Sequence, residues 1–146
     1  MQLSRFTDYS VRVLLYSAAN PERLVTLSEI SQFYNISLEH LRKVVHNLGK
    51  LGYLKTHRGK KGGMQLNLAP CDINIGELIA NVEGEGALID CMGQSCNVAS
   101  LCGLAPALNK AKQAFYAELK TYTLHDMIDV QAMKRLIKDE TLIASC

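Results

Sequence analysis

Two helix-start signals lie close together in the first half of this 146-residue chain and limit what it can fold into. Thr26 opens the sequence TLSE, in which Glu29 stands three residues later, the spacing of a capping box. Asn35, a residue that tolerates left-handed dihedrals, follows as a stop signal, and Ser37 is the next N-cap. Apolar residues then recur at helical spacing at Leu38, Leu41, Val45 and Leu48. The sequence therefore predicts two short helices joined by a tight turn, a helix-turn-helix.

A β-hairpin is predicted directly after these helices. The stretch YLKTHRGKKGGMQLNL, residues 53–68, reads as strand, turn and strand, with glycines that tolerate turn dihedrals. This order of elements is that of a winged-helix DNA-binding domain. We expect base readout from helix 37–49 in the major groove, and phosphate or minor-groove contact from the hairpin. A winged helix that binds proteins is the alternative, and the basic hairpin turn disfavours it.

Charge is distributed unevenly along the chain. Residues 1–70 contain ten Lys or Arg against four Asp or Glu, and residues 71–146 contain six against ten. No acid lies between Glu39 and Asp72. Such a basic block is typical of a polyanion-binding surface, although a solvated basic face would show the same pattern. The candidate DNA-contacting residues are Ser37, Glu39, His40, Arg42 and Lys43 in the helix, and His57, Arg58, Lys60 and Lys61 in the hairpin.

Further helices are predicted on both sides of this unit. Residues 7–19 suit an amphipathic helix that begins at Thr7 and stops at Asn20–Pro21. Residues 73–84 form a short helix, and residues 106–123 form a longer one with Pro106 in its first turn. A final short helix begins at Thr123.

The predicted fold class is mainly α with a small β-hairpin, a winged helix-turn-helix plus a long dimerisation helix. Three segments follow: a winged-helix DNA-binding domain (1–70), a connecting helix and cysteine loop (71–103), and a dimerisation helix with a C-terminal helix (104–146). A long helix beyond a DNA-binding unit suggests a homodimer. The alternative is a helix that folds back on its own domain.

The sequence predicts a cytoplasmic protein with no membrane association. Asp8 and Arg12 interrupt the apolar N-terminal stretch, and no apolar run approaches the roughly eighteen residues of a membrane span. Thiols stay reduced in the cytosol, so a cysteine cluster there more often binds metal or reacts than forms disulfides. The five cysteines, an odd number, also fit a disulfide framework poorly.

Three of those cysteines crowd into the stretch CMGQSCNVASLC, residues 91–102. Thiolates are soft ligands that suit an iron–sulfur cluster or zinc. Gaps of four and five residues separate Cys91, Cys96 and Cys102, wider than a zinc knuckle and better suited to a bulky cluster. Zinc and free redox-active thiols remain alternatives. Cys71 and Cys146 lie outside this group and are interpreted as structural or incidental.

These features together resemble the iron–sulfur winged-helix repressors, the family that includes NsrR and IscR. The resemblance covers nearly the whole chain and rests on the three-cysteine loop and on LSRFTDYSVRVLLYSA, RGKKGG and INIGELI. It implies a homodimeric transcriptional repressor that binds a palindromic double-stranded operator. It also implies that a 4Fe-4S or 2Fe-2S cluster sets the DNA affinity.

The fourth cluster ligand separates the branches of this family. The IscR-like branch has a histidine three residues past the third cysteine, where this chain has Ala105. The NsrR-like branch is more similar, and it implies an aspartate from the partner subunit; the matching residue is Asp8. Without the resemblance, Asp8 would be a first-turn acid favoured by the helix dipole. The chain departs from the family in having four residues between Cys91 and Cys96, where five is commoner.

The NsrR-like resemblance implies nitric oxide as the signal. Within the family, a sensor of iron, cluster supply or redox state is the alternative. From a different class, the chain could be an electron carrier or cluster-transfer protein, but such carriers need no basic hairpin. An enzyme is not predicted, because the sequence suggests no nucleophile–base pair and RGKKGG lacks the spacing of a phosphate-binding loop.

Overall fold

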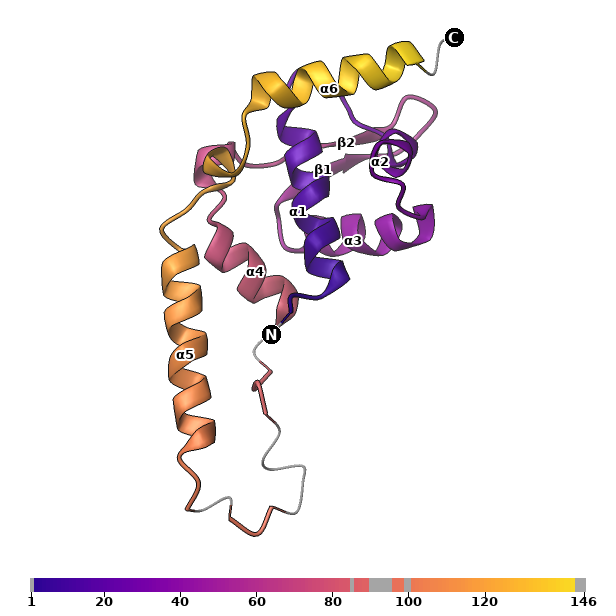
Figure 1. Ribbon diagram of the computed structural model, residues 1–146. Helices are drawn as coiled ribbons and strands as arrows, with labels where there is room; N and C mark the ends of the chain where they lie inside the picture. The colour runs from indigo at the N-terminus through magenta and orange to yellow at the C-terminus, as the bar shows by residue number, and fades with distance from the viewer. Residues whose placement is uncertain (1, 85, 90–95, 99–100, 144–146) are drawn as a thin grey trace.

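The computed structural model describes residues 2–84, 86–89, 96–98 and 101–143. It confirms the predicted class, since it is mainly helical with one antiparallel hairpin (Figure 1). The helices are α1 (Arg5–Ala18), α2 (Leu27–Tyr34), α3 (Leu38–Lys50), α4 (Ile75–Glu83), α5 (Leu104–Leu119) and α6 (Val130–Ile143). The strands are β1 (Leu54–His57) and β2 (Gly63–Leu66), and the short 3-10 turns are η1 (Pro70–Asp72) and η2 (Leu124–Met127). Among the described residues, no helix combines the length and the apolar character that crossing a membrane requires.

Helix α1 begins before the position that the sequence predicts. Its N-cap is Ser4, whose hydroxyl oxygen accepts a hydrogen bond from the Thr7 backbone N–H at 3.2 Å. Thr7 lies inside the first turn, is buried, and donates its hydroxyl to Glu83 of α4. The prediction of Thr7 as the start was wrong because its hydroxyl serves a tertiary partner that the local sequence does not reveal.

The helix-turn-helix has the caps that the sequence predicts. The Thr26 hydroxyl accepts from the Glu29 N–H at 3.3 Å, and the Glu29 carboxylate accepts from the Thr26 N–H at 2.7 Å. Asn35 ends α2 with a φ of 52°, in the left-handed region. Ser37 caps α3 by accepting from the His40 backbone N–H at 3.3 Å. Each cap satisfies an N–H that the helix itself leaves free, so the local sequence defines both starts.

The hairpin pairs Leu54 with Leu66 and is also attached to the start of the helix-turn-helix. Val25 exchanges two backbone hydrogen bonds of 2.8 Å with Met64, which adds one bridge on the outer side of β2. This close approach explains Gly63, where a Cβ would lie 2.7 Å from the Val25 carbonyl oxygen. The extra bridge fixes the hairpin relative to α2.

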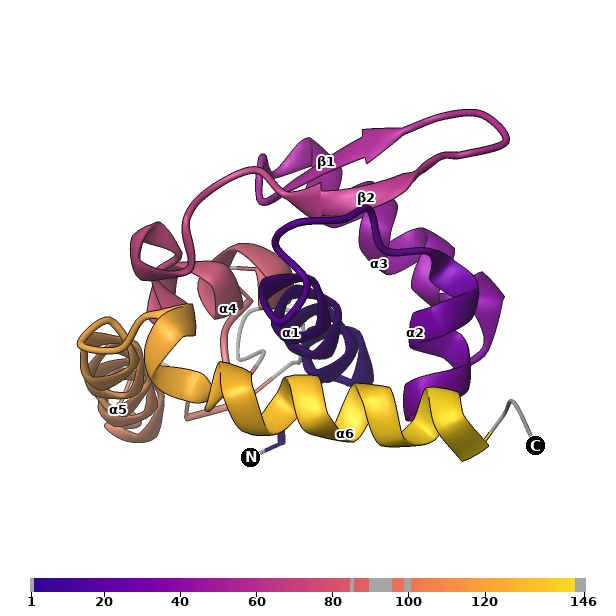
Figure 2. The ribbon, with the colours of Figure 1, turned by 90° about the horizontal axis from the view of Figure 1, so that it is seen from above.

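The core lies around α1, which contacts α3, α4 and β2 (Figures 1 and 2). Fully buried leucines come from each of these helices, namely Leu14, Leu41, Leu48 and Leu78. Complete burial of such a side chain stabilises the fold by about 1.5–3 kcal/mol. Because the buried face of α3 comprises residues 41, 44, 45 and 48, its opposite face is left to solvent.

Helix α5 is attached to α4 near its C-terminal end. Gly76 of α4 allows the approach, since a Cβ there would lie 2.6 Å from the Lys120 backbone nitrogen. The Asn74 side chain caps α4 by accepting from the Glu77 N–H at 3.1 Å and donates to the Lys120 carbonyl at 2.7 Å. From this attachment α5 extends away from the winged-helix unit (Figure 1).

The C-terminal region differs from the prediction. Helix α5 spans residues 104–119 rather than 106–123, although Pro106 does lie in its first turn. Thr123 and Asp126 form a capping box, but the turn they start ends at Ile128, whose backbone is extended. The separate helix α6 follows, and it lies across α1 with Met133 in the core (Figures 1 and 2).

Candidate functional site

The outer face of α3 carries the helix residues that the sequence predicts to contact DNA. Those residues, all exposed, are Ser37, Glu39, His40, Arg42 and Lys43. The Lys43 ammonium lies 3.4 Å from the Glu39 carboxylate, with side chains 67% and 75% exposed. Such an exposed pair contributes little to stability, so a phosphate can replace Glu39 as the partner of Lys43 at small cost.

The hairpin places its basic residues at its free end. His57, Arg58, Lys60 and Lys61 are all exposed. The turn is closed by a hydrogen bond from the Gly62 N–H to the Gly59 carbonyl at 2.9 Å, and Gly59 has a φ of 110° that favours glycine. Figure 2 shows this turn projecting away from the helices. The arrangement presents cationic side chains to a polyanion without neighbouring acids.

Asp8 lies in the first turn of α1 and is exposed. Its carboxylate accepts a hydrogen bond from Arg12 Nε at 2.9 Å, and this contact raises the pKa of Arg12. The two side chains are 48% and 41% exposed. Arg12 also lies over the Tyr34 ring, 5.4 Å from its centroid. Asp8 is therefore accessible to an external ligand, and its contact with Arg12 engages one of its two carboxylate oxygens.

The predicted cysteine ligands are only partly described. Cys96 is exposed and Cys102 is half-buried, whereas Cys91 lies outside the described residues. Within the described part of the chain, no three His, Cys, Asp or Glu side chains are close enough together to hold a metal ion. One chain therefore does not bring Asp8 together with Cys96 and Cys102. Cys71 is exposed in η1, and Cys146 lies outside the described residues.

Glu83, the last residue of α4, connects the start of the cysteine segment to α1. Its carboxylate accepts hydrogen bonds from the Ser4 backbone N–H at 2.7 Å and from the Thr7 hydroxyl. Burial raises the pKa of Glu83, but these hydrogen bonds outweigh it and the net pKa is lowered. The ionised carboxylate thus holds the same turn of α1 that carries Asp8.

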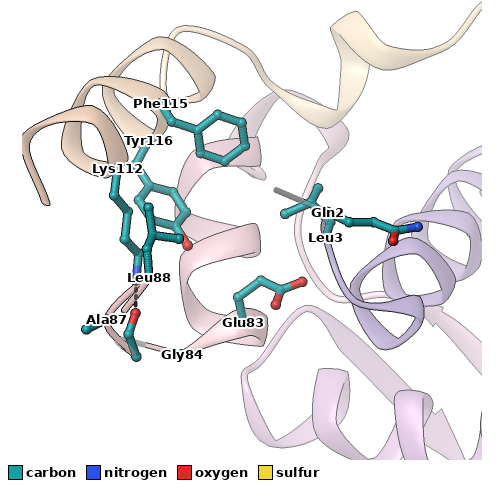
Figure 3. A pocket seen from close by; sticks show the side chains of 10 residues that line it. Gln2, Leu3, Glu83, Gly84, Ala87, Leu88, Lys112, Phe115 and Tyr116 are labelled. Carbon is teal, nitrogen blue, oxygen red and sulfur yellow. Dashed lines mark hydrogen bonds between the residues drawn. The ribbon is translucent and has the colours of Figure 1, made fainter. Parts of the chain in front are cut away.

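A cleft of about 270 Å³ opens beside Glu83, between the N-terminal residues and α5 (Figure 3). The ammonium of Lys112 on α5 donates to the Gly86 carbonyl at 2.5 Å and lies 5.6 Å from the centroid of the Tyr116 ring. These contacts hold the residues that follow α4 against α5. Gly86, which precedes the cysteine segment, is thereby attached to the helix that follows that segment.

Sequence reasoning missed three residues of this arrangement. They are Glu83, Lys112 and Tyr9, whose ring centroid lies 6.1 Å from that of His40. The partners of Glu83 are 79 and 76 positions away in the chain. The local sequence pattern does not predict a contact between residues so far apart in the chain.

Comparisons with known proteins agree with this architecture. The Rrf2 family, described as iron-dependent transcriptional regulators, matches residues 3–130. The HTH-type transcriptional regulator NsrR of Bacillus licheniformis is 45% identical over 132 residues, covering 88% of this chain and 92% of that protein. The regulator of the same name from Bacillus subtilis is 42% identical over 132 residues, covering 88% and 90%.

Among solved structures, IscR of T. potens superposes with a TM-score of 0.66 at 26% identity, covering 87% of this chain and 85% of that one. The resemblance drawn from the sequence motifs is thus confirmed, as is the expectation of a DNA-binding transcriptional regulator. The chain belongs to the Rrf2 family of transcriptional regulators.

Proposed function

We propose that the protein is a homodimeric repressor that binds a palindromic operator, holds an iron–sulfur cluster and releases DNA in response to nitric oxide. The observation that carries this proposal is the position of the cysteine segment between α4, which holds α1, and α5. Before it, Glu83 holds Ser4 and Thr7 of α1. After it, α5 packs on α4. The two Bacillus relatives named NsrR support nitric oxide as the signal.

The exposed face of α3 and the basic hairpin form the DNA-binding surface in this proposal. Helix α3 enters the major groove with its N-terminal residues at the base edges, as recognition helices do. Lys60 and Lys61 in the hairpin turn contact phosphates, which adds affinity but no base discrimination. Two copies on one operator require half-sites separated by about one or two helical turns.

The donor groups fit an iron–sulfur cluster. Cys96 and Cys102 supply accessible thiols, and Cys91 of the same segment supplies the third. Asp8 is exposed and, among the described residues, belongs to no group of three metal-binding side chains, which suits a ligand to the partner's cluster. When bound, the cluster supplies iron with one non-thiolate ligand, at which nitric oxide can bind. Both 4Fe-4S and 2Fe-2S clusters accept three thiolates and a carboxylate.

Asp8 would connect the two subunits through the cluster. While it ligates, it connects the first turn of α1 to the partner subunit. When ligation is lost, the carboxylate keeps its 2.9 Å contact with Arg12. Because α1 packs against α3, a change in the position of α1 alters the angle between the α3 helices of the two subunits. Nitric oxide then favours the non-binding arrangement, which is a population shift.

Anaerobically purified protein provides the test. Absorption and Mössbauer spectra should show an iron–sulfur cluster, and one addition of nitric oxide should weaken operator binding in a titration. Mixing Asp8→Ala with Cys96→Ala subunits should give heterodimers in which one of the two sites keeps all four ligands. Cys71→Ala is the matched control and should keep cluster and response. A colourless, zinc-containing protein would contradict the proposal.

The family description as iron-dependent favours a second candidate, a sensor of iron or cluster supply. The same titration separates the two. Release of DNA by an iron chelator, with no response to nitric oxide, would support the iron sensor.

A further inference from the structure

His40 occupies the first turn of α3, where recognition helices meet base edges. Its side chain is exposed, yet two neighbours hold it. The Ser37 hydroxyl oxygen lies 2.9 Å from Nδ1 of the imidazole, and the Tyr9 ring of α1 lies at 6.1 Å between centroids, tilted by 44°. The orientation and the chemistry of this ring are therefore constrained before DNA arrives.

The direction of the hydrogen bond with Ser37 depends on which nitrogen of His40 carries the proton. As the N-cap, the Ser37 oxygen already accepts from the His40 backbone N–H at 3.3 Å. The hydroxyl keeps its own proton and a second lone pair, so it can donate to Nδ1 or accept from an Nδ1–H. A neutral imidazole has one N–H, so when Nδ1 accepts, Nε2 must carry the proton.

Tyr9 is the aromatic neighbour of the imidazole on α1. The Tyr9 ring is half-buried and packs against the core, so it is a fixed surface rather than a mobile side chain. It lies against the His40 ring on the side of α1. With Nδ1 held by Ser37, Nε2 is the polar atom of the ring left for an outside partner.

We propose that His40 is a specificity-determining residue that donates its Nε2–H to N7 of a guanine in the major groove. The proposal rests on the proposed placement of α3. Guanine presents the acceptors N7 and O6 side by side, whereas adenine places an amino donor beside N7 and cytosine presents a donor. A fixed donor therefore favours guanine over adenine and cytosine, and it distinguishes guanine from thymine by position, because thymine presents its O4 acceptor beside a methyl group.

The test is selection of duplexes from a randomised library by the full-length, anaerobically purified chain. The wild type should enrich a guanine at one position in each half-site. In His40→Ala the preference for guanine at that position should fall about fivefold, the effect of one hydrogen bond. The preferences at the other positions of the half-site should not change. On the selected duplex, 7-deazaguanine at that position should weaken the wild type by the same factor and leave His40→Ala unaffected.

Two variants at Ser37 isolate the role of its hydroxyl. Ser37→Gly keeps most of the N-cap but removes the hydroxyl, whereas Ser37→Thr keeps both. The guanine preference should fall in the first and persist in the second.

Two outcomes would overturn the inference in different ways. The same guanine preference in His40→Ala, or equal wild-type binding to the 7-deazaguanine duplex, overturns the role of His40 alone and leaves the proposed DNA binding intact. If the wild type enriches no sequence at all, the proposed function fails, and this inference fails with it.

Discussion

The winged-helix unit, residues 4–83, and the arm, residues 84–119, are built in contrasting ways. The unit contains nearly all of the buried apolar side chains of the described chain. In the arm, none of the 16 residues of α5 is buried, and Val98, Leu101 and Leu104 are 56%, 89% and 54% exposed. Tyr116 and Leu119 of the arm pack against the core, whereas the described apolar residues from Val98 to Leu104 stay exposed in one copy of the chain. These exposed apolar side chains are covered, in our proposal, by the second subunit and the cluster.

The largest expected effect is loss of the cluster from the arm, with the winged-helix unit still folded. Cys96→Ala should abolish the cluster, because in our proposal two thiolates cannot replace three, and iron and sulfide analysis of anaerobic protein measures the loss. Far-ultraviolet circular dichroism should remain that of the wild type, since Cys96 is exposed and makes no contribution to the core. Cys71→Ala, also at an exposed cysteine, should retain full iron content. Full cluster retention in Cys96→Ala would refute the assignment.

The second prediction compares how much a leucine of each region contributes to the free energy of unfolding. Leu41 is 0% exposed, so Leu41→Ala should lower the free energy of unfolding by about 2–5 kcal/mol. Leu104 is 54% exposed in one copy, so Leu104→Ala should change the stability of the subunit itself by less than about 0.5 kcal/mol, and any larger loss should depend on protein concentration because it comes from the dimer. Urea denaturation at several protein concentrations gives both values. Analytical ultracentrifugation of Leu104→Ala then sharpens the comparison, because a weakened dimer would show that the arm is covered by a second copy. Equal destabilisation by the two variants, independent of protein concentration, would contradict the division.

Sequence predicted the unit better than the arm, and the reason is physical. Thr26 and Ser37 satisfy backbone groups within their own first turns, so a short stretch of sequence contains both the donor and the acceptor. Thr7 was mistaken for a cap because its partner, Glu83, lies 76 positions away. The Cys91 assignment stays a prediction, because that residue lies outside the described chain.

The third prediction concerns the surface of the unit. Lys60→Ala should reduce the slope of log K against log salt by about 0.9, the change expected for one lost phosphate contact. Glu39→Gln is an informative companion, because removing the carboxylate at 3.4 Å frees Lys43 and should strengthen binding slightly. Operator titrations over a range of salt concentrations measure both. If Lys60→Ala leaves affinity and slope unchanged, the hairpin does not contact DNA.

The smallest effect lies at the junction between the two regions. Glu83→Gln should lower the free energy of unfolding by about 1 kcal/mol, since the carboxylate accepts from Ser4 and from the buried Thr7 hydroxyl. The folded-state pKa of Glu83 lies below its ordinary value of 4.5, so its contribution is present above that value and is lost as the pH falls through the folded-state pKa. Urea denaturation of both proteins should therefore show a difference at neutral pH that disappears in acid. Glu118→Gln, at an exposed glutamate of α5, should show neither effect. A difference that stays unchanged as the pH falls into the acid range would show that the loss does not come from the charge of Glu83.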